Sequence, residues 1–161
     1  MPRIGRVVAL CISEVGNVPK YPHEMITVGE FGFVGDFHAG KTRISRTTGQ
    51  PKPNDRQVSL VAKEVLDNLS QELALELKPG DLGENITTEG LGNLADIPNG
   101  WSIKIGETVI LEVTKQNDPC NNLSVYHRLM VKSSYGRRGL LATVVGGAGT
   151  VLRPGATIEI V

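Results

Sequence analysis

The chain has 161 residues, of which 40% are hydrophobic, and its 17 basic and 17 acidic side chains give a formal net charge of zero at pH 7. This length is typical of one domain, and we expect residues 1–161 to fold as one unit. The balanced charge disfavours nucleic acid as a partner. No apolar run is long enough to span a membrane, there is no secretory signal, and the two cysteines form no CxxC pair, so we expect a cytoplasmic protein without disulfides.

The first part of the sequence predicts three strands and one helix. Residues 4–13 are largely apolar and residues 25–34 are rich in β-branched and aromatic side chains, as is typical of strands. A third strand is expected over residues 57–61. It leads into an amphipathic helix that ends before residue 79. The apolar stripe of that helix, with one member every four residues, is Val61, Val65, Leu69 and Leu73.

Residues 41–55 show no apolar period, and we expect an exposed, mobile loop there. The segment is basic, and Asp55 is the only acid close to its cationic side chains. A solvated surface is the expectation for most of them. The basic residues are Lys41, Arg43, Arg46, Lys52 and Arg56.

The second half of the sequence predicts short strands joined by tight turns. Residues 101–105 and 108–114 are typical of a β-hairpin, and the apolar positions between 123 and 130 indicate a short helix. Further strands are expected over residues 140–145, 151–152 and 157–161. Because 19 glycines and 9 prolines punctuate these elements, we predict a mainly β fold, namely a closed or partly open antiparallel β-barrel with two or three peripheral helices.

Cys120 is the most chemically informative residue of the sequence. It follows Pro119 and precedes two asparagines, and in such a polar loop a thiol is accessible as a nucleophile or a soft metal ligand. The alternative is a small buried hydrophobe, which we expect for Cys11 in its apolar strand. For Cys120 the surroundings favour neither alternative. A zinc site that joins Cys120 to the three histidines has no supporting ligand spacing.

A glycine-bracketed polar turn runs from Gly35 to Gly40 and contains Asp36 and His38. Glycine permits positive φ angles and close backbone approach, so these two side chains are candidates to orient a ligand or to transfer a proton. The more common roles are an aspartate that caps its own turn and a histidine that bonds a carbonyl.

Two further groups of residues are candidates for ligand binding. Asn85 and Thr87 fall on one face of a predicted strand, where they would line a barrel mouth, unless that face is simply solvated. Arg56 and Arg137, with Lys41 in reserve, are suited to an anion because arginine makes bidentate phosphate contacts. Arg138 lies in the same glycine-bracketed turn as Arg137, and for Arg138 a solvated basic turn is equally supported.

Four motifs follow one another along the chain before its glycine-rich closing strands: Gly35-Asp36-x-His38-x-Gly40, Arg56-Gln57-Val58-Ser59-Leu60, Pro79-Gly80-Asp81-Leu82-Gly83-Glu84-Asn85-Ile86-Thr87-Thr88-Glu89-Gly90-Leu91 and Pro119-Cys120. Taken together they resemble one protein family, the MOSC domain, which is named after the C-terminal domain of molybdenum cofactor sulfurase. The resemblance covers nearly the whole chain and rests most on the combination of Gly-Asp-Leu-Gly-Glu-Asn with a downstream Pro-Cys pair.

The resemblance implies a β-barrel that handles sulfur or the molybdenum cofactor, molybdopterin. Cys120 matches the key loop cysteine of the family, which either ligates molybdenum as a thiolate or carries sulfur as a persulfide. Members that bind the cofactor reduce N-hydroxylated compounds. The expectation is therefore a molybdenum-dependent oxidoreductase component or, alternatively, a sulfur-transfer protein; a non-catalytic binding domain is the third alternative.

The resemblance also implies secondary roles for residues around Cys120. The polar side chains expected at the pterin edges are Ser59, Asn85 and Thr87. The cationic side chains expected at its phosphate are Arg56, Arg137 and Lys41. His38 and Asp36 are expected to shape the pocket mouth or to shuttle a proton.

The expected partners are the pterin cofactor or a small-molecule substrate, and a separate cysteine desulfurase or electron-donor protein. A separate protein is expected because the sequence contains no iron–sulfur module, no desulfurase domain and no second barrel. Many relatives carry an arginine just before the Pro-Cys pair, whereas residues 115–118 of this chain are Lys-Gln-Asn-Asp.

Overall fold

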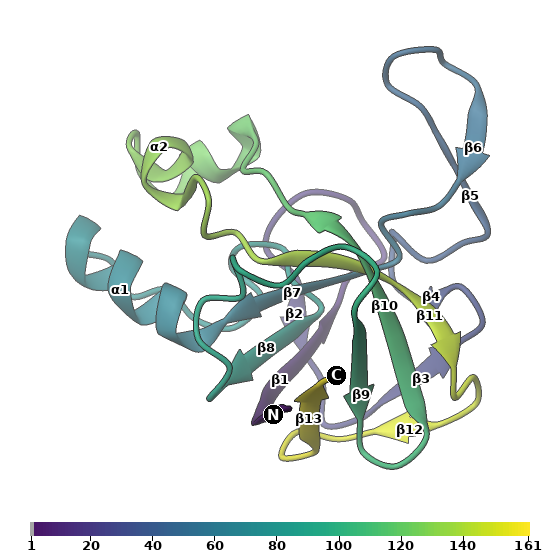
Figure 1. The fold of residues 1–161 in the computed structure, drawn as a ribbon. Coiled ribbons are helices and arrows are strands. Elements are labelled where there is room, and N and C mark those ends of the chain that lie inside the picture. The colour runs from purple at the N-terminus through teal and green to yellow at the C-terminus, as the bar shows by residue number, and fades with distance from the viewer. Residues whose placement is uncertain (1) are drawn as a thin grey trace.

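A closed β-barrel forms the centre of the computed structural model, which describes residues 2–161 (Figure 1). Seven strands follow one another in the order β13-β9-β10-β11-β7-β8-β1, and pairing of β13 with β1 closes the ring. The predicted barrel and its mainly antiparallel pairing are confirmed. The strand bounds are β1 (Arg3–Ile12), β7 (Val58–Ala62), β8 (Ile86–Glu89), β9 (Ser102–Ile105), β10 (Val109–Gln116), β11 (Leu140–Gly146) and β13 (Thr157–Ile160).

One pair of neighbouring barrel strands, β7 and β8, is parallel, with Leu60 opposite Ile86. Parallel neighbours need a crossover connection, and helix α1 (Lys63–Leu73) is part of it. The helix predicted from the apolar stripe is confirmed, except that Val61 belongs to β7. The buried face of α1 consists of Val65, Leu66 and Leu69.

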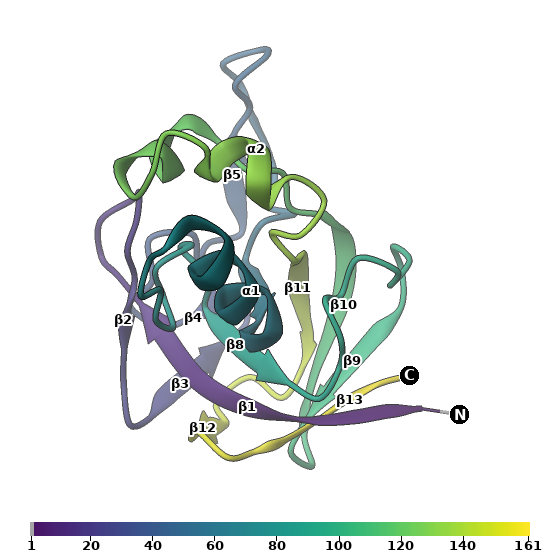
Figure 2. The ribbon, with the colours of Figure 1, turned by 90° about the vertical axis from the view of Figure 1, so that its left-hand side faces the viewer.

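Shorter elements surround the barrel. Strand β2 (Tyr21–Pro22) extends the sheet beside β1, and three strands form a separate sheet, so the single strand expected over residues 25–34 is two strands joined by a turn. The predicted short helix is likewise divided into the 3-10 helix η1 (Asn121–Val125) and helix α2 (Met130–Ser134), and α1 and α2 lie on one side of the molecule (Figure 2). The strands of the separate sheet are β3 (Ile26–Gly29), β4 (Gly32–Phe33) and β12 (Val151–Leu152).

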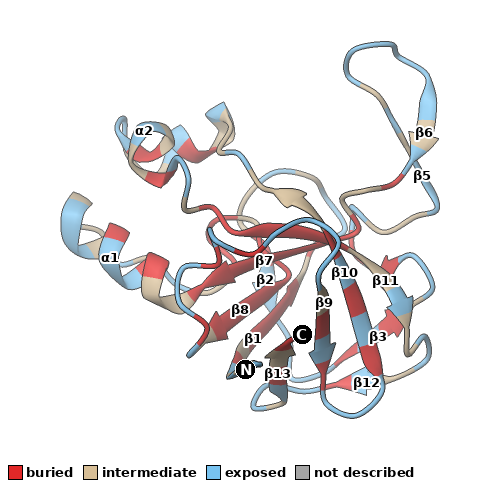
Figure 3. Ribbon diagram, viewed as in Figure 1, coloured by how far each residue is buried: buried red, intermediate tan, exposed pale blue. Residues whose placement is uncertain are grey.

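Residues 41–55, hereafter the arm, form a hairpin that projects away from the barrel (Figure 1). Strands β5 (Thr42–Ile44) and β6 (Pro51–Pro53) pair antiparallel within it. The predicted exposure is confirmed (Figure 3), but the expectation of an irregular loop was wrong. Both faces of a projecting ribbon meet water, so its sequence lacks the apolar alternation by which a half-buried strand is found.

The hydrophobic core fills the barrel and the space beneath α1 (Figure 3). Cys11 lies within it, fully buried and unpaired, as predicted. Burial raises the pKa of its thiol to about 12, with a further contribution from Glu84, so this thiol is inert. Among the described residues, no helix has the length and apolar character needed to cross a membrane.

Gly139 immediately precedes β11, where the chain approaches β7. Its φ of +86° lies in the left-handed region, and a Cβ there would overlap the backbone oxygen of Leu60. Gly136 has a similar φ of +75° but faces open space, so it is a matched control. We expect Gly136→Ala to lower the free energy of unfolding by about 1 kcal/mol. Gly139→Ala should lower it by about 1–3 kcal/mol more, in urea denaturation. Equal losses would show that this backbone contact does not constrain the barrel.

Candidate functional site

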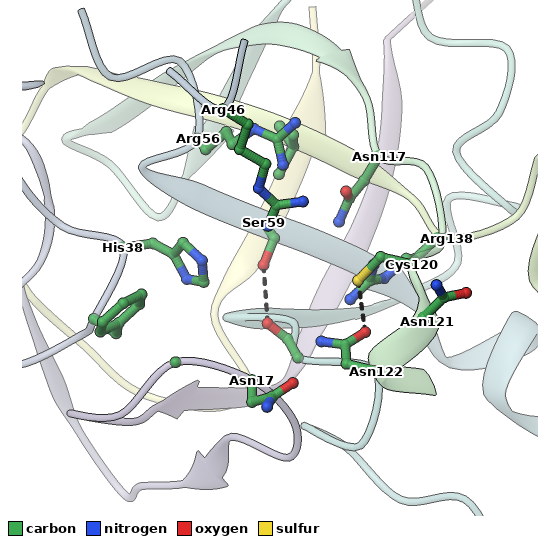
Figure 4. Close-up of a pocket in the computed structure, with 14 residues that line it drawn as sticks. Asn17, His38, Arg46, Arg56, Ser59, Asn117, Cys120, Asn121, Asn122 and Arg138 are labelled. Carbon is green, nitrogen blue, oxygen red and sulfur yellow. Dashed lines mark hydrogen bonds between the residues drawn. The ribbon is translucent and has the colours of Figure 1, made fainter. Parts of the chain in front are cut away.

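A pocket of about 630 Å³ opens beside the barrel (Figure 4). This volume suits a small-molecule ligand, since such sites commonly measure roughly 300–1,000 Å³. Its walls come from six segments of the chain: the loop before β2, the turn at His38, the arm with the start of β7, the turn before β8, the residues around the start of β11, and the loop after β10. The barrel brings these segments together, and Cys120 lies on the last of them.

Cys120 lies half-buried at the N-terminus of η1. Its Sγ donates to Oδ1 of Asn122 at 2.6 Å and accepts from Nη1 of Arg138 at 3.5 Å. The same guanidinium donates to the backbone oxygens of Asp118 and Leu82, at 3.1 and 3.0 Å. Arg138 therefore ties the cysteine loop to the turn before β8 and places a positive charge beside the sulfur.

The pocket is cationic because three arginines enter it from different elements: Arg46 from the arm, Arg56 from the segment before β7, and Arg138 (Figure 4). None of the described residues that line it is acidic. Asp55, the carboxylate nearest in sequence to Arg56, is instead bonded by Nε of Arg43 at 2.8 Å. The positive charge of the pocket is therefore not neutralised by its own lining and is available to an anionic ligand.

Burial lowers the pKa of Arg56, and the charge of Arg43 lowers it further. The Nε of Arg56 is also buried without a hydrogen-bond partner among the described residues. Both observations indicate a guanidinium that an anion would stabilise.

A buried ion pair supports the His38 turn from beneath. Nζ of Lys20 donates to both carboxylate oxygens of Asp36, at 2.9 and 2.8 Å, and both side chains are at most 1% exposed. The Asp36 carboxylate also accepts from the backbone N–H groups of Ser13 and His38, each at 3.1 Å. Asp36 does not line the pocket, so it acts by holding His38 in place.

The Lys20 ammonium also fixes the protonation of His38. Its Nζ lies 3.2 Å from Nδ1 of His38. An ammonium can only donate, so Nδ1 accepts and the proton of the neutral ring is assigned to Nε2. Burial lowers the pKa of His38 to about 4, and the Lys20 charge contributes further. At neutral pH His38 is therefore an uncharged hydrogen-bond donor on the pocket wall across from Cys120 (Figure 4).

Asn54, which sequence reasoning did not single out, connects the base of the arm to the pocket. Its Nδ2 donates to the backbone oxygens of His38 and Gly40, at 2.7 and 2.8 Å. Its Oδ1 accepts from the backbone N–H of Arg56 at 3.0 Å. One buried amide thus positions two pocket residues, and no sequence motif signals it because its partners are backbone atoms.

The other predicted pterin contacts are divided between the pocket and the interior. Ser59 lines the pocket. Asn85 is buried, bonding the backbone of Ser59 at 3.0 Å and that of Cys11 at 3.0 Å, so it joins three barrel strands. Thr87 is also buried and donates to the carboxylate of Glu84 at 2.9 Å. Neither Asn85 nor Thr87 is among the residues that line the pocket, a placement that differs from the predicted barrel mouth.

Two of the predicted phosphate contacts also lie elsewhere. Arg137 makes a bidentate ion pair with Glu72 of α1, at 3.1 and 2.8 Å, and does not line the pocket. Lys41 is exposed at the base of the arm. Arg138 takes the place predicted for Arg137, and Arg46 joins Arg56. The sequence carried both signals, in the glycine-bracketed arginine pair and in the basic segment, but not the choice between neighbours.

These observations define a β-barrel protein whose pocket combines one thiol with arginines and a neutral histidine. The chain belongs to the MOSC domain family, which matches residues 35–159. Its fold is similar to that of the YUAD protein from Bacillus subtilis, with a TM-score of 0.88, 21% identity, and coverage of 99% of this chain and 97% of that one. A comparison with curated proteins gives no match.

Two further solved structures share the fold at lower similarity. YiiM from Geobacillus stearothermophilus has a TM-score of 0.73 and 19% identity, over 98% of this chain and 75% of that one. YiiM from Escherichia coli has a TM-score of 0.64 and 20% identity, over 97% and 69%. At these identities the similarity establishes the fold alone.

We expect the imidazole of His38 to titrate near pH 4 in an NMR titration, well below its ordinary value of 6.5. In the unfolded chain the same imidazole is protonated near pH 6.5, so as the pH falls the unfolded state binds a proton before the folded state does. The contribution of neutral His38 to the free energy of unfolding is therefore lost between about pH 6.5 and 4. His38→Gln keeps an acceptor for Lys20 and should lack this contribution.

Glu84 also titrates in this pH range, because burial raises the pKa of its carboxyl group to about 7. Its contribution to the free energy of unfolding changes in the opposite sense and falls as the pH rises from 4.5 to 7. Glu84 is present both in the unmodified chain and in His38→Gln, so its contribution cancels when the stabilities of the two proteins are subtracted. A His38 midpoint near 6.5 would contradict the arrangement with Lys20.

Proposed function

We propose that the pocket binds the molybdenum–pterin cofactor with the Cys120 thiolate as a metal ligand, in a protein that reduces N-hydroxylated compounds. The MOSC domain family is associated with molybdenum-cofactor binding. The observation that carries the proposal is the presence of a half-buried thiol and three arginines in one pocket whose described lining holds no carboxylate.

The side chains present fit such a cofactor. A thiolate is a suitable ligand for a soft metal centre, and guanidinium groups suit a phosphate. Arg46 and Arg56, which enter the pocket from the arm and the segment before β7, are the residues assigned to the phosphate. When bound, the cofactor supplies electron transfer through its metal.

The other residues of the pocket have binding and orienting roles in this proposal. Ser59 and the amides of Asn17 and Asn117 offer hydrogen bonds to a polar heterocycle (Figure 4). His38 offers its Nε2–H to an oxygen of the substrate, and Lys20 keeps that tautomer in place. Arg138 holds the Cys120 loop closed against the turn before β8.

Expression in a host that makes the cofactor, followed by molybdenum and pterin analysis of the purified chain, tests this proposal. Cys120→Ser should reduce bound molybdenum at least about tenfold, since loss even of a residue that supports a metal ligand commonly costs roughly 10–100-fold in affinity. Cys11→Ala, which removes the buried thiol that does not line the pocket, is the matched control and should retain metal. Full molybdenum in Cys120→Ser would rule out the ligand role.

A second candidate function is sulfur carriage by a Cys120 persulfide, with sulfur supplied by a separate cysteine desulfurase. It is favoured by the contact between Arg138 and Sγ, because a perthiolate carries negative charge on its outer sulfur. The third alternative, a non-catalytic binding domain, expects a buried thiol, whereas Cys120 lines the pocket.

Incubation with an active cysteine desulfurase and sulfur-labelled cysteine should load reductant-labile sulfur onto the chain at Cys120. Cys120→Ser should take up none, and Cys11→Ala should be labelled as strongly as the unmodified chain. An unlabelled chain beside a turning-over desulfurase would exclude delivery by this route.

A further inference from the structure

Arg138 is an almost buried cation without a carboxylate partner. It is 8% exposed, it forms no ion pair with any described residue, and its Nε has no hydrogen-bond partner among them. A buried charge is costly unless an opposite charge compensates it. Its partners are two backbone oxygens and the Cys120 sulfur, so the missing negative charge belongs on that sulfur or on a ligand next to it.

The pocket limits which anions could react with the thiol. None of its described lining residues is an aspartate or glutamate, and His38 is an uncharged imidazole, whose Nε2–H can donate a hydrogen bond but is too weak an acid to give up its proton to a departing oxygen. A phosphate ester needs such a proton for its alkoxide leaving group. An anion whose leaving group departs without a proton fits this pocket better, and a soft sulfur electrophile matches the soft thiolate.

We propose that the pocket binds thiosulfate and that Cys120 accepts its outer sulfur, which makes the chain a thiosulfate sulfurtransferase. The thiol first loses its proton to water. The Cys120 thiolate then attacks the outer sulfur of thiosulfate, so that a new S–S bond forms as the old S–S bond breaks, and sulfite leaves with the electron pair of the broken bond. The products are a Cys120 perthiolate and sulfite, and no external oxidant or reductant is required.

The arginines divide the binding of this anion. Arg138 lies beside the sulfur and compensates the charge that the perthiolate carries. Arg46 and Arg56, from the other walls, meet the sulfonate oxygens before sulfite leaves. Thiosulfate is small relative to the pocket of about 630 Å³, so an acceptor can reach the perthiolate and remove the sulfur.

This activity goes beyond cofactor binding and does not depend on it. A pterin in the pocket would cover Cys120, so one molecule performs one role at a time. The test uses the full chain purified from a host that makes no pterin cofactor, and its result is independent of the molybdenum analysis. The desulfurase assay is also separate, because a chain that accepts sulfur only from a desulfurase would keep its carrier role and lose this one.

The chain is mixed with thiosulfate. The mass of the peptide that contains Cys120 is then determined by mass spectrometry after digestion, and the sulfite released is measured in parallel. We expect one added sulfur atom on Cys120 and an equal amount of sulfite; added cyanide should then regenerate the thiol and release thiocyanate catalytically. Cys120→Ser should abolish both signals. No added sulfur on a Cys120 that still reacts with a thiol reagent would overturn the proposal.

Variants of the arginines test the anion site. Arg138→Gln should lower kcat/KM for thiosulfate by about 10- to 100-fold. Because Arg138 also holds the loop, Arg46→Gln on the exposed arm is the variant that leaves the fold intact, and it should raise the thiosulfate KM about threefold. Arg137→Gln, next in sequence but paired with Glu72, is the matched control and should match the unmodified chain. Unchanged kinetics in both Arg46→Gln and Arg138→Gln would contradict the site.

Discussion

Pairing of the two ends of the chain is the constraint on which the rest of the structure depends. Strand β1 meets β13 with Arg3 opposite Ile160, and this contact turns a sheet into a ring. Once the ring is closed, the loops that leave its strands have fixed neighbours. The Cys120 loop, the His38 turn and the segment before β7 then form one pocket although more than eighty residues separate the first two in sequence.

The protein buries cations near this pocket in two different ways. Lys20 is neutralised by Asp36 and serves to orient His38, so its charge is used within the structure. Arg138 donates to two backbone oxygens and to the cysteine sulfur and forms no ion pair with any described residue, so its charge remains available to the pocket. The contrast explains how a chain with no formal net charge builds a cationic site: the acids are engaged elsewhere.

The sequence predicted most of the barrel because strands and helices that bury one face leave a period in the order of apolar residues. It did not predict the parallel pairing of β7 with β8, which depends on how the α1 crossover returns the chain. The β5–β6 hairpin was missed since neither of its faces is buried. The positioning role of Asn54 could not be predicted, because its hydrogen-bond partners are backbone atoms and backbone groups are the same at every position of a sequence.

By itself, the sequence determined that Cys11 would be buried and that Cys120 was the candidate functional thiol, because local polarity differs strongly between an apolar strand and an asparagine-rich loop. Only the tertiary structure decided which of two adjacent arginines faces that thiol. Arg137 turns to Glu72 on α1 and Arg138 turns to Cys120. Adjacent residues share a composition and a turn, but their side chains point in different directions, and what each one meets is set by elements far away in sequence.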